Sequence, residues 1–459
     1  MLLQSHLMRY LLTLKLIVLA LFASTANAQQ ITNLPDYVIA KFGTPPSIPN
    51  GPLSSEAQEA LDRVVADNLD QANWKPSDKG ALDTLAKSKD PRLGWIIVDM
   101  MRFSWRPEFS NAIANLAIEL LDINIKSIRH RAEITNYLIA WDMPSYPGYL
   151  NQKRTIYTNF NPNWNKIFTE GNIKWHLVAW GGVDIDARPY DTTDEVCNCI
   201  PAADNPKVSS AESASWLKDD DIVFGIGING EYRAYPRRIM EVREMVNDTL
   251  GGRDLGIPYC TLCGAAQAYF TDELPKGVER PILRTSGLLI RSNKVMYDVR
   301  SNSVFDTFRG NAVTGPLAKI GLHLKQTSVV TTTWGEWKTA HPETTVLIEE
   351  LALGRDFNLR NTRDANGPIF PVGDIDPRLP VQEDVIGVLT KSGVPVAFPR
   401  AQALLSLKNG KKINVENVQI VLASGGLKAI DIDGSDLGSH QAFWFAWSQF
   451  YPTTKIWKG

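Results

Sequence analysis

The chain has 459 residues, of which 44% are hydrophobic and 21% charged, a composition typical of globular proteins and unlike that of disordered, collagen-like or membrane-embedded chains. Lysine and arginine number 48 against 50 aspartates and glutamates, so a net charge of −2 gives no basic surface for a nucleic acid partner. The four cysteines are too few for a disulfide-built scaffold, so their role must be local.

Residues 1–28 have the pattern of an export signal peptide. Arg9 and Lys15 are positively charged, Leu16–Ala23 is apolar, and Ala26-Asn27-Ala28 is a small-residue cleavage site. The apolar stretch is about half of the roughly 20 residues that span a bilayer. We therefore expect a periplasmic or secreted protein, with no transmembrane segment after cleavage, in a compartment where disulfides persist.

Residues 29–150 are expected to form a helical domain. Ser55 stands three residues before Gln58 at the start of an apolar pattern with helical spacing, and Pro91 and Pro107 lie where a first helical turn tolerates proline. Short helices with short connections fit either a HEAT-like stack or an irregular helical domain, because no fixed repeat period distinguishes the two. The expected helices are Ser54–Asp70, Lys79–Ser88, Pro91–Phe103, Pro107–Asp122 and Ser127–Ala140.

Residues 151–218 lose this pattern and are rich in aromatic residues and turn formers, which indicates an irregular connector. From Asp219 onward the chain contains short runs of strand formers, and Asn229-Gly230 between the first two is a strong hairpin signal. We therefore predict an α+β protein with a β-rich domain over residues 219–459. The expected strands are Ile222–Ile228, Tyr232–Tyr235, Leu255–Tyr259, Ile282–Ile290 and Val329–Thr332.

The β-rich part repeats itself in sequence. Asp221-Ile222-Val223 and Ala234-Tyr235-Pro236-Arg237 recur 163 residues later, without a gap, as Asp384-Val385-Ile386 and Ala397-Phe398-Pro399-Arg400. A tryptophan pair, Trp334 and Trp337, recurs 110 residues later as Trp444 and Trp447. The order of the elements is kept, so we expect an internally duplicated domain. Its related halves, residues 219–345 and 384–454, would pack as sub-barrels or half-sheets about a pseudo-twofold axis.

The motif with the most chemical content is Tyr259-Cys260-Thr261-Leu262-Cys263-Gly264. Two thiols at this spacing before a glycine suit a tight turn whose sulfurs converge. A thioredoxin-like site is disfavoured, because Ala265–Phe270 leaves too little room for the long helix that stabilises its thiolate. A knuckle for a transition metal such as zinc or copper fits the turn, but it supplies only two of the four ligands of a closed site.

Cys197 and Cys199 leave three arrangements open. Together with Cys260 and Cys263 they complete a four-thiolate metal site, or disulfides cross-link the two segments, since a bond closed within either motif would be strained, or the thiols are buried and unpaired. Among the histidines we single out His440, because it precedes the aromatic run Phe443-Trp444-Phe445.

Taken together, these residues resemble the domain of unknown function 3179 family, a group of mostly exported bacterial proteins without an established activity. The resemblance covers residues 219–347 and includes the cysteine motif, Asn229-Gly230, Val246-Asn247-Asp248, Ser286-Gly287-Leu288-Leu289 and Met296-Tyr297-Asp298. Relatives usually carry a histidine where this chain has Arg243, just before Glu244. The resemblance supports a site around Cys260 and Cys263, with Tyr259, Gly264, Arg243, Glu244, Asn247, Asp248 and Asp298 as its neighbours, and implies no reaction.

Two classes of function follow from the residues. The first is a metal-binding or thiol-redox protein that uses Cys260 and Cys263, and it leaves open whether the protein is an enzyme. The second is a non-catalytic module that binds a small molecule or a protein, with the cysteines as a structural disulfide staple. The sequence identifies neither the partner nor the metal.

The signal peptide gives a first testable prediction. Mass spectrometry of the protein purified from its native host should find an N-terminus at Gln29, because cleavage is expected after Ala28. A membrane-bound form that retains Met1 would contradict this expectation.

Overall fold

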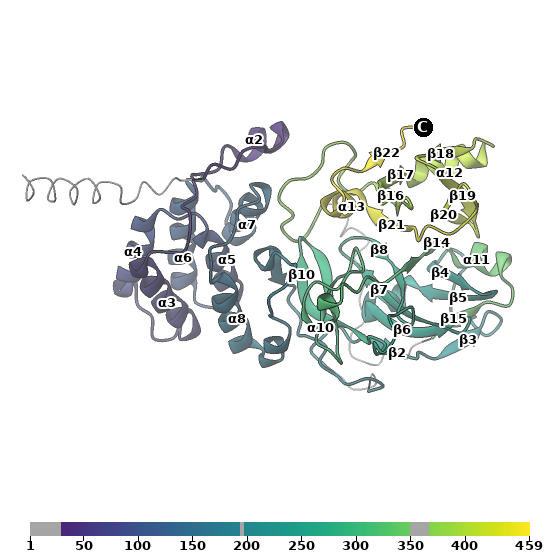
Figure 1. Cartoon of the computed structure of the whole chain (residues 1–459), viewed down its shortest axis with the longest axis horizontal. Coiled ribbons are helices and arrows are strands. Elements are labelled where there is room, and N and C mark those ends of the chain that lie inside the picture. Colours follow the sequence, from purple (N-terminus) through teal and green to yellow (C-terminus); the bar gives the residue numbers. More distant parts are fainter. Residues whose placement is uncertain (1–28, 193–196, 349–366) are drawn as a thin grey trace, which may run out of the picture.

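The computed structural model describes residues 29–192, 197–348 and 367–459. The expected signal peptide, residues 1–28, lies outside the described residues. A helical region and a β-rich region lie side by side, with β10 facing the helices (Figure 1). Within the described ranges, no helix combines the length and the apolar character needed to cross a membrane.

The five expected helices are confirmed to within a few residues at their ends. The side chain of Ser54 accepts a hydrogen bond from the backbone N–H of Ala57 and so caps α3, and Pro107 occupies the first turn of α6. Helix α5 is largely buried, because α6, α7 and α8 all pack against it. The helices are α2 (Asp36–Phe42), α3 (Ser55–Leu69), α4 (Gly80–Ser88), α5 (Leu93–Phe103), α6 (Pro107–Leu121), α7 (His130–Ala140) and α8 (Tyr149–Phe160).

The helical region and the first sheet share one hydrophobic core. Trp95 and Leu138 from the helices belong to the same buried cluster as Leu288 and Val295 from the sheet. The indole N–H of Trp164 also donates to the carbonyl of Ser286, 2.8 Å away. This sheet consists of β1 (Val178–Trp180), β10 (Leu283–Ile290), β11 (Asn293–Asp298) and β12 (Val304–Asp306).

The segment expected as an irregular connector, residues 151–218, contributes to three sheets. Its strand β1 pairs with β10, β2 (Ala203–Asp204) pairs with β6, and β3 (Val208–Ser210) pairs with β15. The sequence did not predict these strands, because they are only two or three residues long and lie among aromatic residues and turn formers.

The predicted architecture of two related halves is wrong. The β-rich character is as expected, but the described residues form five sheets in a five-bladed β-propeller-like arrangement. Besides the first sheet, the strand orders are β13-β9-β7-β6-β2 with β8 beside β7, β14-β4-β5-β15-β3, β21-β16-β17-β22, and β18-β19-β20.

The remaining strands are β4 (Ile222–Ile228), β5 (Glu231–Pro236), β6 (Met245–Leu250), β7 (Arg253–Cys260), β8 (Ala265–Ala266), β9 (Ala268–Phe270), β13 (Gln326–Thr327), β14 (Val330–Thr333), β15 (Thr345–Leu347), β16 (Asp384–Leu389), β17 (Pro395–Pro399), β18 (Ile413–Val415), β19 (Val418–Ala423), β20 (Gly426–Asp431), β21 (His440–Phe443) and β22 (Lys455–Ile456). The helices among them are α9 (Arg237–Arg243), α10 (Gly315–Lys319), α11 (Trp334–Ala340), α12 (Arg400–Lys408) and α13 (Trp444–Phe450).

The sequence repeat corresponds to two of these five sheets. In β14-β4-β5-β15 and in β21-β16-β17-β22, the first two pairings are antiparallel and the last is parallel. A short helix follows the outer strand in each sheet, and its tryptophan donates to a threonine seven residues later. The indole N–H of Trp337 lies 2.9 Å from Oγ1 of Thr344, and that of Trp447 lies 2.8 Å from Oγ1 of Thr454.

The gapless alignment of the repeat is wrong in its first strand. Val223 pairs with Pro236 and Val385 pairs with Pro399, so Val223 corresponds to Val385 and not to Ile386. The first hairpin turns through Asn229-Gly230, whereas the second encloses one residue more, between Thr390 and Val394.

The packing of each tryptophan against a strand glycine gives a second prediction. A Cβ on Gly225 would lie 2.1 Å from the ring of Trp337, and one on Gly387 would lie 2.1 Å from the ring of Trp447. We expect Gly225→Ala and Gly387→Ala each to lower the free energy of unfolding by about 1–3 kcal/mol or more, measured by urea denaturation.

Gly80→Ala is the matched control, because a Cβ there meets no atom within 4 Å and the residue begins helix α4. It should leave stability unchanged or raise it slightly. If Gly225→Ala and Gly387→Ala behaved like Gly80→Ala, the assigned tryptophan packing would be incorrect.

Candidate functional site

A cavity of about 180 Å³ lies beside the turn that follows β7. Its apolar wall includes Leu288, Leu289, Val295 and Phe370. Its polar lining includes Cys260, Thr261, Glu244 and Lys294. An apolar cavity with a few convergent polar groups is the usual form of a small-molecule site.

The cysteine motif forms the expected turn. Strand β7 ends at Cys260, the backbone N–H of Cys263 donates to the carbonyl of Cys260 at 3.2 Å, and β8 pairs back onto β7. Gly264 adopts a φ of 61°, and a Cβ there would lie 3.0 Å from the ring of Phe443. This position therefore requires glycine, and the chain continues directly into β8 and not into a helix.

Cys260 and Cys263 lie at disulfide distance, with their Cα atoms 5.3 Å apart. Both cysteines are buried, Cys260 with 4% and Cys263 with 0% of its surface exposed, and of the two only Cys260 lines the cavity. Oxygen atoms from the β10–β11 turn lie next to both. The carbonyl of Ser292 is 3.7 Å from Sγ of Cys260 and 3.6 Å from Sγ of Cys263, and Oδ1 of Asn293 is 3.4 Å from the latter sulfur.

A buried ion pair forms the charged part of the cavity. Nζ of Lys294 lies 2.8 Å from Oε2 of Glu244 and donates to the carbonyl of the same residue at 2.6 Å. The hydroxyl of Thr261 donates to Oε1 of Glu244 at 2.8 Å. Burial lowers the pKa of the Lys294 amine, and the charge of Glu244 acts in the opposite direction.

The backbone of Glu244 is also unusual. It ends helix α9 with a φ of 48°, a conformation that residues other than glycine rarely adopt. Its N–H donates to the carbonyl of Met240 at 2.7 Å, and its carbonyl accepts from the N–H of Tyr259 at 2.9 Å. Rare backbone conformations of this kind cluster at functional sites.

Three of the expected neighbours have structural roles and are not among the residues that line this cavity. Asn247 exchanges hydrogen bonds of 3.0 Å with the backbone of Leu283. Asp248 is held by Arg233 at 2.6 Å and by the hydroxyl of Tyr235 at 2.7 Å. Asp298 accepts the backbone N–H groups of Ile282 and Ser301 at 2.8 and 2.9 Å and so shapes a turn.

Tyr259, Arg243 and His440 are buried in the core. The ring of Tyr259 packs against Phe224 with 4.9 Å between centroids, and Arg243 is the last residue of α9. His440 lies on β21 between Phe308 and Trp447, with its Nδ1 2.9 Å from Nε2 of Gln326. Burial lowers the pKa of His440 to about 3, so the ring is neutral at physiological pH.

The expected cross-links and the four-thiolate site do not form. Cys197 pairs with Cys199, with 5.1 Å between their Cα atoms, so each motif closes on itself. The argument that a bond within either motif would be too strained was therefore wrong. The backbone of Cys199 forms a bridge with Asp184, and the neighbouring Ile200 lines the cysteine cavity, but the sulfurs of Cys197 and Cys199 bond to each other.

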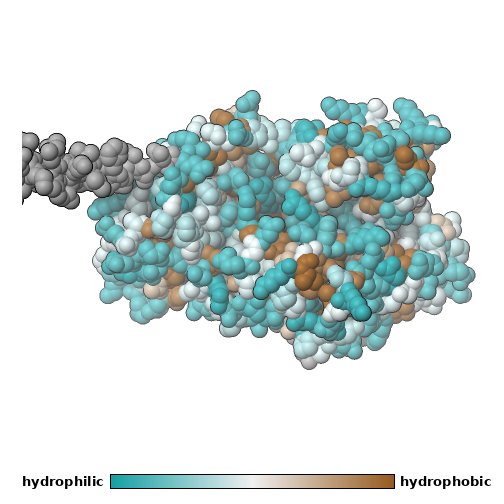
Figure 2. Space-filling model, in the orientation of Figure 1, coloured by the Kyte–Doolittle hydropathy of each residue, from teal (hydrophilic) through white to brown (hydrophobic). Residues whose placement is uncertain are grey.

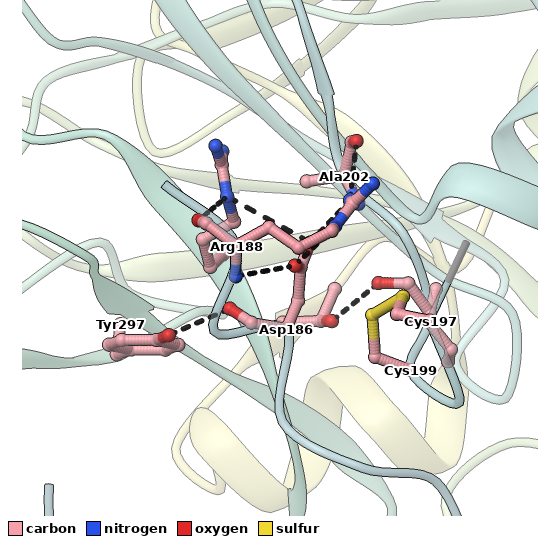
Figure 3. The surroundings of a disulfide bond; sticks show 9 residues. Asp186, Arg188, Cys197, Cys199, Ala202 and Tyr297 are labelled. Atoms are coloured by element: carbon pink, nitrogen blue, oxygen red, sulfur yellow. Dashed lines mark hydrogen bonds and ion pairs between the residues drawn. A yellow bond between two sulfur atoms is a disulfide. The ribbon is translucent and has the colours of Figure 1, made fainter. Parts of the chain in front are cut away.

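Among the described residues, the group of three potential metal ligands is Asp186, Cys197 and Cys199, whose ligand atoms lie within 4.8 Å of one another (Figure 3). The carboxylate of Asp186 is already bound by the guanidinium of Arg188 at 2.8 Å and by the N–H of Ala202 at 2.9 Å. With the sulfurs bonded to each other and the carboxylate engaged, this group does not fit a metal ion.

Sequence reasoning missed Lys294, Thr261 and the turn residues Ser292 and Asn293. A charged lysine directly before the apolar run Val295-Met296-Tyr297 was the available signal, because a lysine in a buried strand needs a partner. The oxygens of Ser292 and Asn293 carry no such signal.

Comparison with protein families matches residues 197–433, just over half of the chain, to the family described as "Protein of unknown function (DUF3179)". The chain belongs to this family. The matched range contains all four cysteines together with Glu244 and Lys294, and it leaves out the helical region. Comparisons with curated proteins and with solved structures find no match. The family has no established activity, so the chemistry must be argued from the site.

The ion pair gives a third prediction. Lys294→Met leaves the Glu244 carboxylate buried without its partner, which typically costs about 3–5 kcal/mol of unfolding free energy. Lys174→Met is the control, since Lys174 and Asp142 form a pair whose side chains are 56% and 52% exposed. It should cost about 1 kcal/mol or less by urea denaturation. Equal costs for the two variants would contradict the burial of the Lys294 pair.

Proposed function

We propose that this chain is an exported thiol–disulfide redox protein, in which Cys260 is the attacking thiol and Cys263 the resolving thiol. One observation carries the proposal. Cys260, although only 4% exposed, lines a cavity that also holds the Glu244–Lys294 ion pair, whereas Cys263 is 0% exposed and is not among the residues lining it. Thiol exchange needs one reachable sulfur and a second, protected sulfur beside it.

The reaction is the reduction of a small disulfide compound. The Cys260 thiolate attacks one sulfur of the compound, its S–S bond breaks, a mixed disulfide forms and one thiolate leaves. The Cys263 thiolate then attacks Cys260, which releases the second thiolate. The protein loses two electrons as its dithiol becomes a disulfide, the compound gains them, and the two thiol protons pass to the leaving thiolates. The reverse reaction with a small dithiol restores the reduced protein.

The surroundings of the sulfurs support this chemistry. In the reduced state the two S–H groups can donate to the carbonyl of Ser292, and Cys263 also to Asn293. No helix follows the motif, so a helix dipole does not stabilise the thiolate here. A nearby ammonium group also stabilises a thiolate, and Lys294 lines the same cavity as Cys260.

The alternatives have less support. A metal knuckle needs more ligands than two sulfurs, and within the described ranges no histidine or carboxylate completes a group of three around Cys260 and Cys263. For a protein-binding module we would look for a large apolar patch. The face in Figure 2 is mostly hydrophilic, with apolar atoms in small scattered groups.

The asymmetry of the two sulfurs gives a fourth prediction. In Cys263→Ser, the remaining thiol lines the cavity and should form a mixed disulfide when the native protein is incubated with oxidised glutathione. In Cys260→Ser, the remaining thiol is buried and should react at least about tenfold more slowly. Mass spectrometry of the intact variants measures both rates.

Three results would contradict the proposal. Equal trapping in the two variants would show that Cys260 is not the reachable sulfur. An absence of trapping in both, with a stability loss of about 2–5 kcal/mol in each, would indicate a structural staple. Stoichiometric metal in the wild type by elemental analysis, lost in both variants, would indicate a metal site.

A further inference from the structure

A second, smaller cavity of about 30 Å³ lies between the helical region and the first sheet. It is lined by Arg102 of α5, Arg131 of α7, His176 of the segment Trp175–Leu177, and Arg291 of the β10–β11 turn, which pairs with Asp374 at 3.6 Å. Leu289 and Phe370 line both this cavity and the cysteine cavity. This volume exceeds the roughly 10–15 Å³ that one water molecule needs, so the cavity has room for water or a small ion.

Two guanidinium groups line this cavity with unused hydrogen-bonding capacity. Nε of Arg102 donates to the carbonyl of Trp180 at 2.8 Å, and its Cζ stands 4.9 Å from the centre of the Trp180 ring. Within residues 29–192, 197–348 and 367–459, the terminal nitrogens of Arg102 and the whole guanidinium of Arg131 have no hydrogen bond or ion pair closer than 4 Å. Both side chains are half-buried, so water can reach these donors, and an anion in the cavity would replace that water.

The electrostatics of the cavity favour an anion. Burial and, next in size, the charge of Arg131 lower the pKa of Arg102 to about 10, so the two cations destabilise each other. The carboxylate of Asp99, which also lines the cavity, stabilises the charge of Arg131, but it is shared with Lys153 at 2.7 Å and with the hydroxyls of Tyr149 and Tyr157 at 2.5 and 2.9 Å. Because both arginines are half-buried, their repulsion is only partly screened, and a further negative charge beside them would be favourable.

His176 adds a third unsatisfied group. In the described part of the chain, its Nε2 is buried and has no hydrogen-bond partner. Burial lowers the pKa of His176 to about 3, so the ring is neutral and one of its nitrogens carries a proton that it can donate. The histidine and the two arginines thus line one cavity of ion size.

We propose that this cavity is a binding site for a small monovalent anion of the carboxylate class, held by Arg131 and Arg102. A carboxylate matches the planar fork of a guanidinium and accepts two hydrogen bonds from it. The proposal does not rest on the redox chemistry of the cysteines, even though Leu289 and Phe370 line both cavities.

The test is a titration of the purified full-length chain with sodium formate. Ionic strength is held constant with sodium gluconate, whose anion is a carboxylate too large for the cavity. We expect the melting temperature of the wild type to rise and to saturate with formate. Arg131→Gln should weaken the apparent formate affinity by about tenfold or more. Arg129→Gln is the matched control, because Arg129 is exposed and lies two residues earlier. It should behave like the wild type.

The outcome is decisive in either direction. A wild type without a saturable response to formate, or an Arg131→Gln variant with unchanged formate affinity, would overturn the proposal. If Arg131→Gln does not fold, Arg131→Leu and Arg131→Lys replace it. The lysine variant keeps the charge without the fork and should bind formate more weakly than the wild type but more tightly than the leucine variant. Equal affinity in the lysine variant and the wild type would overturn the proposed fork contact.

Discussion

The cysteine site depends on the buried ion pair between Lys294 and Glu244, which joins the β10–β11 hairpin to the end of α9. On one side of the pair, the residues just before Lys294 supply the oxygens next to both sulfurs. On the other side, the carbonyl of Glu244 accepts the N–H of the residue just before Cys260. Taking both charges out of water costs several kcal/mol before their attraction is counted. Other buried pairs, such as Lys153–Asp99 and Arg284–Asp204, lie elsewhere in the fold, and what sets the Lys294–Glu244 pair apart is its place in the wall of the cysteine cavity.

The shared hydrophobic core connects the helical region to the cysteine cavity. Leu288 and Val295 pack against the helices on one side, and both residues line the cysteine cavity. The hairpin that carries Ser292 is therefore held from both directions. The smaller cavity, which is lined by Arg102 and Arg131, lies where the same hairpin meets α5 and α7. An anion bound there would add a counter-charge between the helical region and the first sheet, so its effect on stability should extend to both regions.

The parts of this structure that follow from local chemistry could be predicted, and the parts that follow from distant contacts could not. The capping serine before α3, Pro107 in α6 and Asn229-Gly230 in the first hairpin each act within a few residues, and these elements were located correctly. The five sheets require pairings such as β2 with β6, whose order no local pattern encodes. The cysteine turn was predictable because the glycine and the spacing of the thiols lie within it. Lys294 and Ser292 were missed, because only the pairing of distant strands brings them next to the cysteine turn. Asp248 instead pairs with Arg233 on another strand, which its local sequence does not indicate.

The central claim is that the Cys260–Cys263 bond opens and closes while the protein stays folded. The most direct measurement equilibrates the native protein in a series of glutathione buffers and determines the reduced fraction of each cysteine pair by alkylation and mass spectrometry, with circular dichroism recorded in parallel. The account predicts that Cys260 and Cys263 become reduced together, with the slope of a two-electron reaction, while the circular dichroism spectrum is unchanged. A bond that stays closed until the spectrum shows unfolding would contradict it.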